Sequence, residues 1–301
     1  MSGDAEPVQG GLRTQSSAGA IASVVIPAHD EEQRIGANLR SLLADARPGE
    51  FDVVVVCNGC SDRTAEAARQ VPAARVAEIE AASKIAALRE GDRLTRVFPR
   101  IYLDADVVLT TAAARAIVEA LRDPRPRVAG VPGSYDLSDA SLPVRLFYEF
   151  RQRLPVFREG VIGAGVYAMN LAGRQRFGEW PEVLADDQFI YRLFQGDERE
   201  TVHDHHTIVE PPSTLRDEMR RGVRVRRGIA QLSRGSDDVA PLPAPRAGVR
   251  SALHGSVRSP RGIASAVVFT LTTIIVRFRT KLGRRGDWTS VSAGRVRRGR
   301  R

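Results

Sequence analysis

A unit that recurs along about the first 120 residues constrains the fold most. Each copy consists of a short apolar run, a polar turn and a segment with helical spacing. Residues 21–27 form an apolar run rich in β-branched side chains and ending at Pro27, which is typical of a buried strand. Residues 35–43 then place their apolar side chains on one helical face. Residues 52–57, which include four consecutive valines, begin a second unit. Asp62 is placed to cap the helix of this unit, at residues 64–71.

Further units extend the pattern. The remaining expected strands cover residues 75–79, 100–103, 128–131 and 203–209, and the remaining expected helices cover residues 83–90, ended by Gly91, and 111–121. Strands that alternate with helices predict an α/β fold with a mostly parallel twisted sheet and helices on both faces. Ligands of such sheets bind beyond the carboxyl ends of strands, here around His29, Asn58 and Asp106.

Charge divides the chain into two parts. Residues 216–301 carry 21 basic and 5 acidic side chains, whereas residues 1–215 carry 24 and 31. We interpret the basic tail as a contact for an anionic membrane surface. Nucleic acid is not the expected partner, because the tail contains few aromatic side chains for stacking on bases. An arginine-rich composition without a partner remains the plain alternative.

Composition predicts the domain boundaries. We expect a disordered leader at residues 1–20, a catalytic domain at 21–232, a linker rich in Pro, Gly, Ser and Arg at 233–260, and a basic C-terminal segment at 261–301. An uncharged run of 14 residues lies at 263–276. Because a membrane span usually needs about 20 apolar residues, we favour a buried or interfacial helix for this run.

The leader lacks the order of a secretory signal, and the only cysteines are Cys57 and Cys60. A reduced, cytoplasmic protein is therefore the simpler interpretation. The C-x-x-C spacing of the two cysteines leaves a redox or metal role open as a minor alternative.

Several polar groups are candidates for chemistry on a nucleotide and a sugar. Asp104 and Asp106 follow an apolar strand, and their hard oxygens suit Mg²⁺ or Mn²⁺. Asp186 and Asp187 begin an expected helix, whose dipole stabilises carboxylates. Lys84 is one of two lysines among 45 basic residues, which favours a phosphate or nucleotide contact. Each signal alone is also compatible with solvated turn residues, helix caps or chance.

The order of these signals resembles the family 2 glycosyltransferases, which share the GT-A fold, over about residues 22–230. The segment at 24–32 is similar to that family's first strand and acidic continuation, and residues 57–64 are similar to its second motif. Residues 84–91 match a Lys-x-x-Ala-Leu-x-x-Gly element, Asp104 to Asp106 match a metal-binding Asp-x-Asp, and residues 163–167 take the place of the acceptor-site glycines.

The resemblance implies a role for each matched residue. The implied donor-binding residues are Pro27, Ala28, His29, Glu31, Asn58, Lys84, Asp104, Ala105 and Asp106. Asp187 would be the catalytic base, Asp106 and His205 would bind the metal, and Asp186, Arg221 and Arg224 would face the acceptor or the diphosphate. His203, His205 and His206 lie close together in the sequence, and the sequence does not show which of the three would bind the metal.

Three departures from the family pattern matter. Asp30 replaces a more usual asparagine, and Asn58 replaces a carboxylate, which leaves the choice between uracil and guanine open. Val225 stands where processive polysaccharide synthases have tryptophan, which favours transfer of a single sugar.

The resemblance therefore implies an inverting glycosyltransferase that uses a nucleoside-diphosphate sugar, needs Mg²⁺ or Mn²⁺, and acts on a cell-envelope or lipid-linked glycan. We expect it in the cytoplasm, peripheral on the inner face of the plasma membrane. One alternative is a sugar nucleotidyltransferase of the same fold, although its Gly-rich signature after the first strand is absent. The other is a catalytically inactive relative that binds membrane or nucleic acid.

Overall fold

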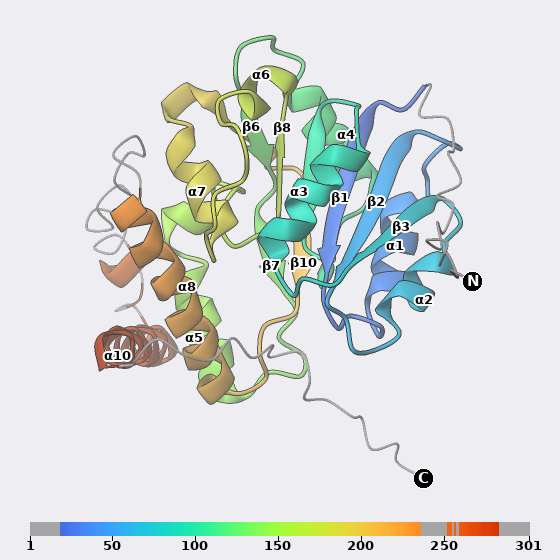
Figure 1. Cartoon of the computed structure of the whole chain (residues 1–301). Coiled ribbons are helices and arrows are strands. Elements are labelled where there is room, and N and C mark those ends of the chain that lie inside the picture. Colours follow the sequence, from blue (N-terminus) through green and yellow to red (C-terminus); the bar gives the residue numbers. More distant parts are fainter. Residues whose placement is uncertain (1–18, 236–251, 255, 257–258, 283–301) are drawn as a thin grey trace.

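The computed structural model describes residues 19–235, 252–254, 256 and 259–282. Its main feature is a seven-stranded sheet, whose place in the fold Figure 1 shows. The spatial order of the strands is β3-β2-β1-β4-β8-β6-β9. These strands are β1 (Ala22–Ala28), β2 (Phe51–Asn58), β3 (Ala74–Ile79), β4 (Arg100–Leu103), β6 (Val128–Gly130), β8 (Val166–Met169) and β9 (Arg199–Thr201). Strands β1 to β4 are parallel, whereas β8 runs antiparallel to both β4 and β6. The expected mostly parallel sheet is thus confirmed.

Alternate side chains of the central strands enter two different cores. Val24 and Val53 point toward the core that contains α1 (Ile35–Leu43), α2 (Thr64–Arg69) and α4 (Thr111–Ala120). Their neighbours Val25 and Val54 point toward α3 (Lys84–Leu94) on the other face. Because helices cover both faces of these strands, the middle of each strand consists of consecutive apolar residues, mostly valine and isoleucine, and does not alternate between apolar and polar residues.

Helix α3 corrects one expectation. We expected Gly91 to end the helix, but α3 continues to Leu94. A Cβ atom at Gly91 would lie 2.2 Å from Cγ1 of Val25, so the glycine allows α3 to approach β1 closely. Ser83 caps the start of the helix, because its hydroxyl accepts a hydrogen bond from the Ala86 N–H.

A second, three-stranded sheet has the order β5-β10-β7. It consists of β5 (Val107–Val108), β7 (Gly133–Tyr135) and β10 (Thr207–Val209). The strand that we expected from residue 203 is therefore shorter, and His203 lies in a turn before it. Antiparallel pairing of β10 with β5 places Val209 opposite Val107, directly after the Asp-x-Asp segment.

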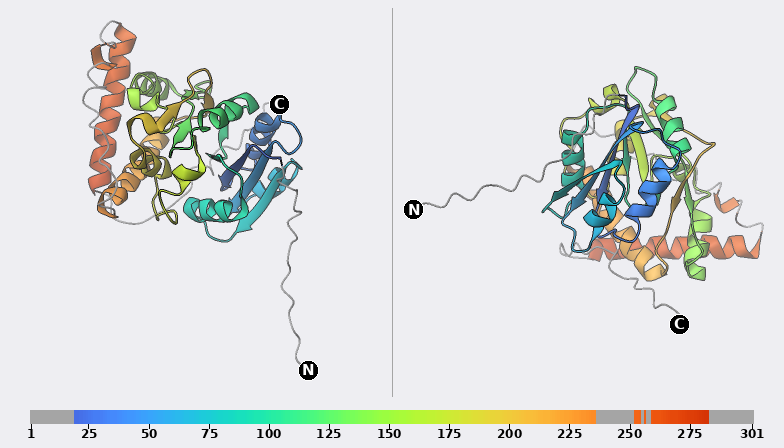
Figure 2. Two further views of the ribbon diagram at one scale, coloured as in Figure 1. Left: turned by 90° about the horizontal axis from the view of Figure 1, so that it is seen from above. Right: turned by 90° about the vertical axis from the view of Figure 1, so that its right-hand side faces the viewer.

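The remaining helices and turns lie on the β8–β9 side of the sheet (Figure 1). They are α5 (Leu142–Arg151), α6 (Leu171–Arg174), α7 (Asp186–Leu193), α8 (Leu215–Gly235), α10 (Pro260–Leu282) and the 3-10 turns η1 (Pro155–Phe157) and η2 (Gly196–Glu198). Helix α10 lies against α5 and α8 at the edge of the molecule, far from β3 (Figure 2).

Helix α10 is longer than the uncharged run at residues 263–276. It has 23 residues and is long and apolar enough, by length and composition alone, to cross a membrane. Two residues of the expected linker, Ala252 and Ser256, are buried, and Arg153 donates a hydrogen bond to the Ser256 hydroxyl at 2.8 Å. The expected leader and most of the expected linker and distal tail lie outside the described residues, so the domain boundaries stay predictions.

Candidate functional site

The candidate site lies where the parallel strands β1, β2 and β4 end. Because these strands run in the same direction, their carboxyl ends bring His29, Asn58 and Asp104 to one edge of the sheet. Lys84, at the start of α3, reaches the same edge from the covering helix. Its Nζ lies 2.7 Å from Asp104 Oδ1 and 2.9 Å from Asp186 Oδ1. Lys84 therefore joins two carboxylates that are more than eighty residues apart in the sequence.

Burial raises the pKa of Asp104 to about 6, an effect that Lys84 opposes and that Asp186 strengthens. Asp186 is buried, and the Tyr167 hydroxyl donates a 2.7 Å hydrogen bond to its Oδ2. Lys84 and Tyr167 thus satisfy both oxygens of Asp186. This arrangement positions Asp186 as a structural partner at the start of α7 rather than as a free base.

Asp187 has a different environment. Its Oδ2 accepts a hydrogen bond from the Gly163 N–H at 3.2 Å, and its Oδ1 accepts one from the Gln188 N–H at 2.7 Å. No cation pairs with it directly among the described residues. Burial, followed by the charge of Asp186, raises the pKa of Asp187. A carboxylate with a raised pKa is a better proton acceptor, as a general base requires.

The glycines at residues 163–165 connect the two acidic groups. Gly163 and Gly165 have φ values of +70° and +67°, a conformation that favours glycine. The Asp104 N–H donates a 2.8 Å hydrogen bond to the Gly165 carbonyl, while Gly163 contacts Asp187. A Cβ atom at Gly165 would lie 2.4 Å from Cγ2 of Val107 and 3.4 Å from Asp104 Oδ2. One turn therefore holds Asp104 and Asp187 in fixed relation.

Asp106 faces a second group of charges. Burial, followed by the charge of Asp106, raises the pKa of Glu31 to about 7. Arg34 lies 3.2 Å from Glu31 Oε2 and 3.3 Å from Glu210 Oε2, so it connects these two carboxylates. Glu210 directly follows Val209, which pairs with Val107, and Val107 directly follows Asp106. Within the described residues, no side-chain cation lies at ion-pair distance from Asp106.

Arg34 and Glu210 were missed by the sequence analysis. Each had a local signal, because Arg34 follows Glu31 by three residues and Glu210 is the polar residue that ends a short β-branched strand. Neither signal shows that the two side chains meet, because 176 residues separate them.

Arg221 and Arg224 approach the site from α8. Arg221 Nη1 donates a 3.2 Å hydrogen bond to the Tyr148 hydroxyl, which in turn donates one of 2.8 Å to Glu218. Both arginines interact electrostatically with Asp106, and Arg224 also interacts with Asp104. They bring positive charge to the acidic site without pairing directly with a carboxylate there.

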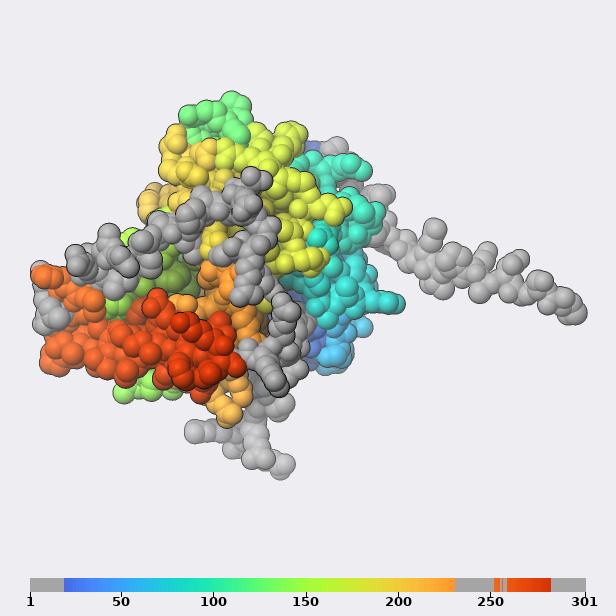
Figure 3. Space-filling model, turned by 60° about the vertical axis from the view of Figure 1, so that its left-hand side comes forward, coloured from blue at the N-terminus to red at the C-terminus, as the bar shows by residue number. Residues whose placement is uncertain are grey.

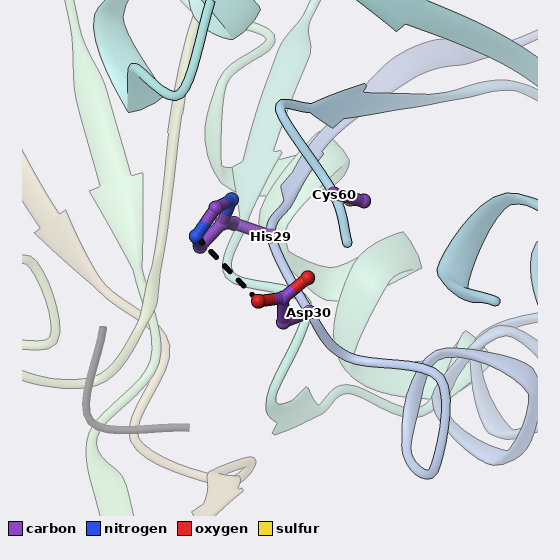
Figure 4. A group of neighbouring side chains, drawn as sticks. All are labelled: His29, Asp30 and Cys60. Carbon is purple, nitrogen blue, oxygen red and sulfur yellow. Dashed lines mark ion pairs between the residues drawn. The ribbon is translucent and has the colours of Figure 1, made fainter. Parts of the chain in front are cut away.

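His29, Asp30 and Cys60 form a cluster at the ends of β1 and β2 (Figure 4). One potential ligand atom of each lies within 4.8 Å of the others. His29 Nδ1 lies 2.7 Å from the Asn58 carbonyl oxygen, and Asp30 Oδ1 accepts a hydrogen bond from the Ser61 N–H. These bonds join the two strand ends that the sequence analysis assigned to the donor. The side chain of Asn58 itself is buried.

Both cysteines are free thiols. A hydrogen bond with Cys57 lowers the pKa of Cys60 to about 6. His205 is half-buried in the loop before β10, and among the described residues it forms no ion pair with Asp106. The described contacts thus bring Asp104, Asp106, Lys84, Asp186 and Asp187 into one charged site, whereas the metal role of His205 stays a prediction.

The residues present suit a hard divalent cation. Asp106 carries a carboxylate with no direct cationic partner in the described chain, and Asp104 shares its only such partner, Lys84, with Asp186. Carboxylate oxygens of this kind are ligands for Mg²⁺ and Mn²⁺. A bound cation would also reduce the repulsion that raises the pKa of Glu31.

A comparison with protein families matches residues 19–180 to the model of the glycosyltransferase-like family 2. The chain belongs to this family. It is therefore a glycosyltransferase. The fold and the enzyme class that the sequence resemblance implied are both confirmed. The matched region contains β1 to β4, the Asp-x-Asp segment and the glycine turn, but it ends before Asp186.

A solved mannosyltransferase structure shares the fold, and a second glycosyltransferase structure is more distantly similar. A mannosyltransferase from Pyrobaculum calidifontis, in complex with GDP-Man and Mn²⁺, is 19% identical with a TM-score of 0.57, covering 87% of this chain and 83% of that one. Glucosyl-3-phosphoglycerate synthase from Mycobacterium tuberculosis, with Mn²⁺ and UDP, is 21% identical with a TM-score of 0.49, covering 72% and 80%. No curated protein sequence matches.

Proposed function

We propose that this glycosyltransferase moves one sugar from a nucleoside-diphosphate sugar to an acceptor hydroxyl with inversion at the anomeric carbon. The observation that best supports this reaction is the glycine turn at residues 163–165. It hydrogen-bonds Asp104, of the donor and metal segment, and Asp187, the candidate base. Because one turn contacts both carboxylates, it supports a direct displacement in which the donor and the acceptor are held at one site.

Each residue has a role in the proposed reaction. Asp187 removes the proton of the acceptor hydroxyl while that oxygen attacks the anomeric carbon, and the bond from this carbon to the diphosphate breaks. The proton remains on Asp187, and the nucleoside diphosphate leaves. A divalent cation bound by Asp106 and Asp104 would supply charge stabilisation for the diphosphate. Arg221 and Arg224 add positive charge on the same side.

The nucleotide would lie against the ends of β1 and β2. Pro27, Ala28, His29 and Glu31 end β1 or follow it, and Asn58 ends β2. The His29 ring is fixed by the Asn58 carbonyl, which suits a flat surface beside a base. The mannosyltransferase of similar fold is in complex with GDP-Man and Mn²⁺, which supports a nucleotide and Mn²⁺ here.

We extend the proposal to the acceptor and its location. A cell-envelope or lipid-linked glycan, reached from the cytoplasmic face of the plasma membrane, fits the excess of basic residues after residue 215. Val225 in place of the tryptophan of processive synthases supports transfer of one sugar for each encounter.

The test is a panel of UDP- and GDP-sugars with Mn²⁺ or Mg²⁺, measuring binding and turnover for the wild type, Asp106→Ala, Asp187→Asn and the control Asp197→Asn. Asp197 is 85% exposed and lies on η2, outside the site. We expect Asp106→Ala to lose metal-dependent binding. Asp187→Asn should bind the donor but lose on the order of 10²–10⁴-fold in turnover. Full turnover of Asp187→Asn would contradict the assigned base.

Product analysis separates the alternatives. NMR of fresh product should show the anomeric configuration opposite to that of the donor, and a retained configuration would contradict inversion. Formation of a nucleotide sugar from a sugar phosphate and a nucleoside triphosphate would favour the nucleotidyltransferase. Absence of binding to every nucleotide sugar would favour the inactive relative.

A further inference from the structure

Helix α10 lies along the outside of the molecule (Figure 3). It exposes a stripe of apolar side chains there. The side chains of this stripe are between 40% and 67% exposed, and they are Ile263, Val267, Leu271, Ile274, Ile275, Phe278 and Leu282. At about 100° per residue, all seven fall within an arc of roughly 120° that runs the full length of the helix. This α10 stripe is a continuous surface rather than a set of scattered apolar residues.

The opposite side of α10 is packed against the protein. Phe269 contacts Phe147 and Phe150 of α5, with ring centroids 5.1 and 4.8 Å apart. Val276 packs so closely on α8 that a Cβ atom at Gly222 would lie 3.1 Å from its Cγ2. At the start of α10, Arg261 forms an ion pair with Glu149 of α5 at 2.9 Å. The helix is therefore held to the domain along most of its length.

This packing decides between two orientations that length alone leaves open. A helix that crosses a bilayer would carry α5 and α8 into the hydrocarbon, together with Glu149, Arg153 and Arg226. Burying such charges in lipid costs several kcal/mol each. A helix that lies in the membrane plane places only its apolar stripe among the acyl chains and leaves its packed side on the protein.

Basic side chains border the α10 stripe. Arg277, Arg279 and Lys281 are exposed, and within the described chain none of them forms an ion pair with a carboxylate. At about 100° per residue, Arg277 and Arg279 lie on opposite edges of the stripe. Burial, together with the charge of Arg277, lowers the pKa of Arg226 on α8, so two cations lie close together at the α8–α10 junction. Residues 283–301 add seven arginines and one aspartate.

We propose that α10 anchors this protein in the plane of an anionic lipid bilayer, with its apolar stripe among the acyl chains and its basic border at the headgroups. Charge favours lipid over a second copy of the chain as the occupant. Two α10 stripes packed face to face would bring their unpaired basic borders together, whereas anionic headgroups neutralise them. The anchor would also bring α8, with Arg221 and Arg224, to the bilayer surface.

The proposal is tested without any sugar, so its outcome is independent of the proposed reaction. The full chain is floated with phosphatidylcholine vesicles, with or without phosphatidylglycerol, at low and high salt. We expect binding that needs the anionic lipid and weakens with salt. A Leu271→Ser, Ile274→Ser and Phe278→Ser triple variant and an Arg277→Gln, Arg279→Gln and Lys281→Gln triple variant should each lose at least about tenfold in affinity.

The matched control is Leu171→Ser, on α6, whose side chain is 50% exposed outside the α10 stripe. It should bind vesicles as the wild type does. Wild-type binding by the serine triple variant, or no binding by the wild type, would overturn the proposal. A wild-type dimer that becomes a monomer in the serine triple variant, without vesicle binding, would instead assign the stripe to a second copy.

Depth measurements test the orientation. Ile263→Trp, Leu271→Trp and Phe278→Trp are compared in a Trp288→Phe background, using brominated lipids that quench tryptophan at known depths. The signal of this background, in which the buried Trp180 is the only tryptophan, is subtracted. A helix in the membrane plane predicts similar, shallow depths for the three positions. A central position that is much deeper than the two ends would show that α10 crosses the bilayer, which contradicts the proposal.

Discussion

At the scale of single residues, the candidate site brings several carboxylate side chains close together. Asp104, Asp106, Asp186, Asp187 and Glu31 lie around one edge of the sheet, and Lys84 is the cation that pairs with two of them directly. Burial, followed by mutual repulsion, raises the pKa of Glu31, Asp104 and Asp187. Such a site favours binding of a cation, and without a metal the stability of the protein should depend on pH.

Glu31 provides a test of that dependence. Its pKa rises from an ordinary 4.5 to about 7, so the folded protein holds a proton there that the unfolded chain releases. The contribution to stability is complete below pH 4.5 and is lost as the pH rises through 7. Urea unfolding of metal-free protein should therefore show Glu31→Gln gaining stability relative to the wild type between pH 5 and pH 8. The expected gain is on the order of 1–3 kcal/mol.

The control for this comparison is Glu66→Gln, because Glu66 is exposed on α2. Its difference from the wild type should stay constant over the same pH range. A constant difference for Glu31→Gln as well would show that Glu31 ionises normally in the folded protein.

At the scale of elements, close contact between helix and strand positions the site. Helix α3 carries Lys84 at its first residue and packs on β1 through Gly91. Any shift of this helix moves Lys84 relative to Asp104 and Asp186. Residues that touch no ligand can therefore affect the charged site through the α3–β1 contact.

Gly91→Ala should be strongly destabilising. The added methyl group would lie 2.2 Å from Cγ1 of Val25, a buried side chain in the central strand, so α3 or β1 must move. Overpacking of this kind costs about 1–3 kcal/mol, which outweighs the helix propensity gained. Thermal and urea unfolding would measure the loss. Gly178→Ala, where a Cβ atom meets nothing within 4 Å, is the control and should be close to neutral.

At the scale of the whole molecule, α10 has two faces with separate tasks. The inner face completes a small core with α5, and the α10 stripe faces outward. Stability and membrane attachment should therefore respond to different residues of the same helix.

Phe269→Ala and Phe278→Ala separate the two tasks. Phe269 contacts two rings of α5, so its removal should cost about 2 kcal/mol of unfolding free energy. Phe278 is 65% exposed, and its removal should change stability by less than about 0.5 kcal/mol while weakening vesicle binding. Equal stability losses for the two variants, measured by urea unfolding, would show that the outer face also packs on protein.

The sequence alone was sufficient for the fold class, because buried parallel strands have a local signature in β-branched runs such as residues 52–57. It also identified the acidic pairs at residues 104–106 and 186–187, since they follow a strand or begin a helix. The family match confirmed the glycosyltransferase interpretation, and the individual site roles, the acceptor and the membrane contact are proposals.

Only the tertiary structure decided contacts between distant segments. The pairing of Arg34 with Glu210 depends on the register of β10 against β5. The need for glycine at position 91 within α3 depends on the nearby Val25 side chain of β1. The orientation of α10 likewise depends on which of its sides packs against α5 and α8. Local patterns report the energetics of one segment, whereas these features arise from packing and charge between segments that meet only in the folded chain.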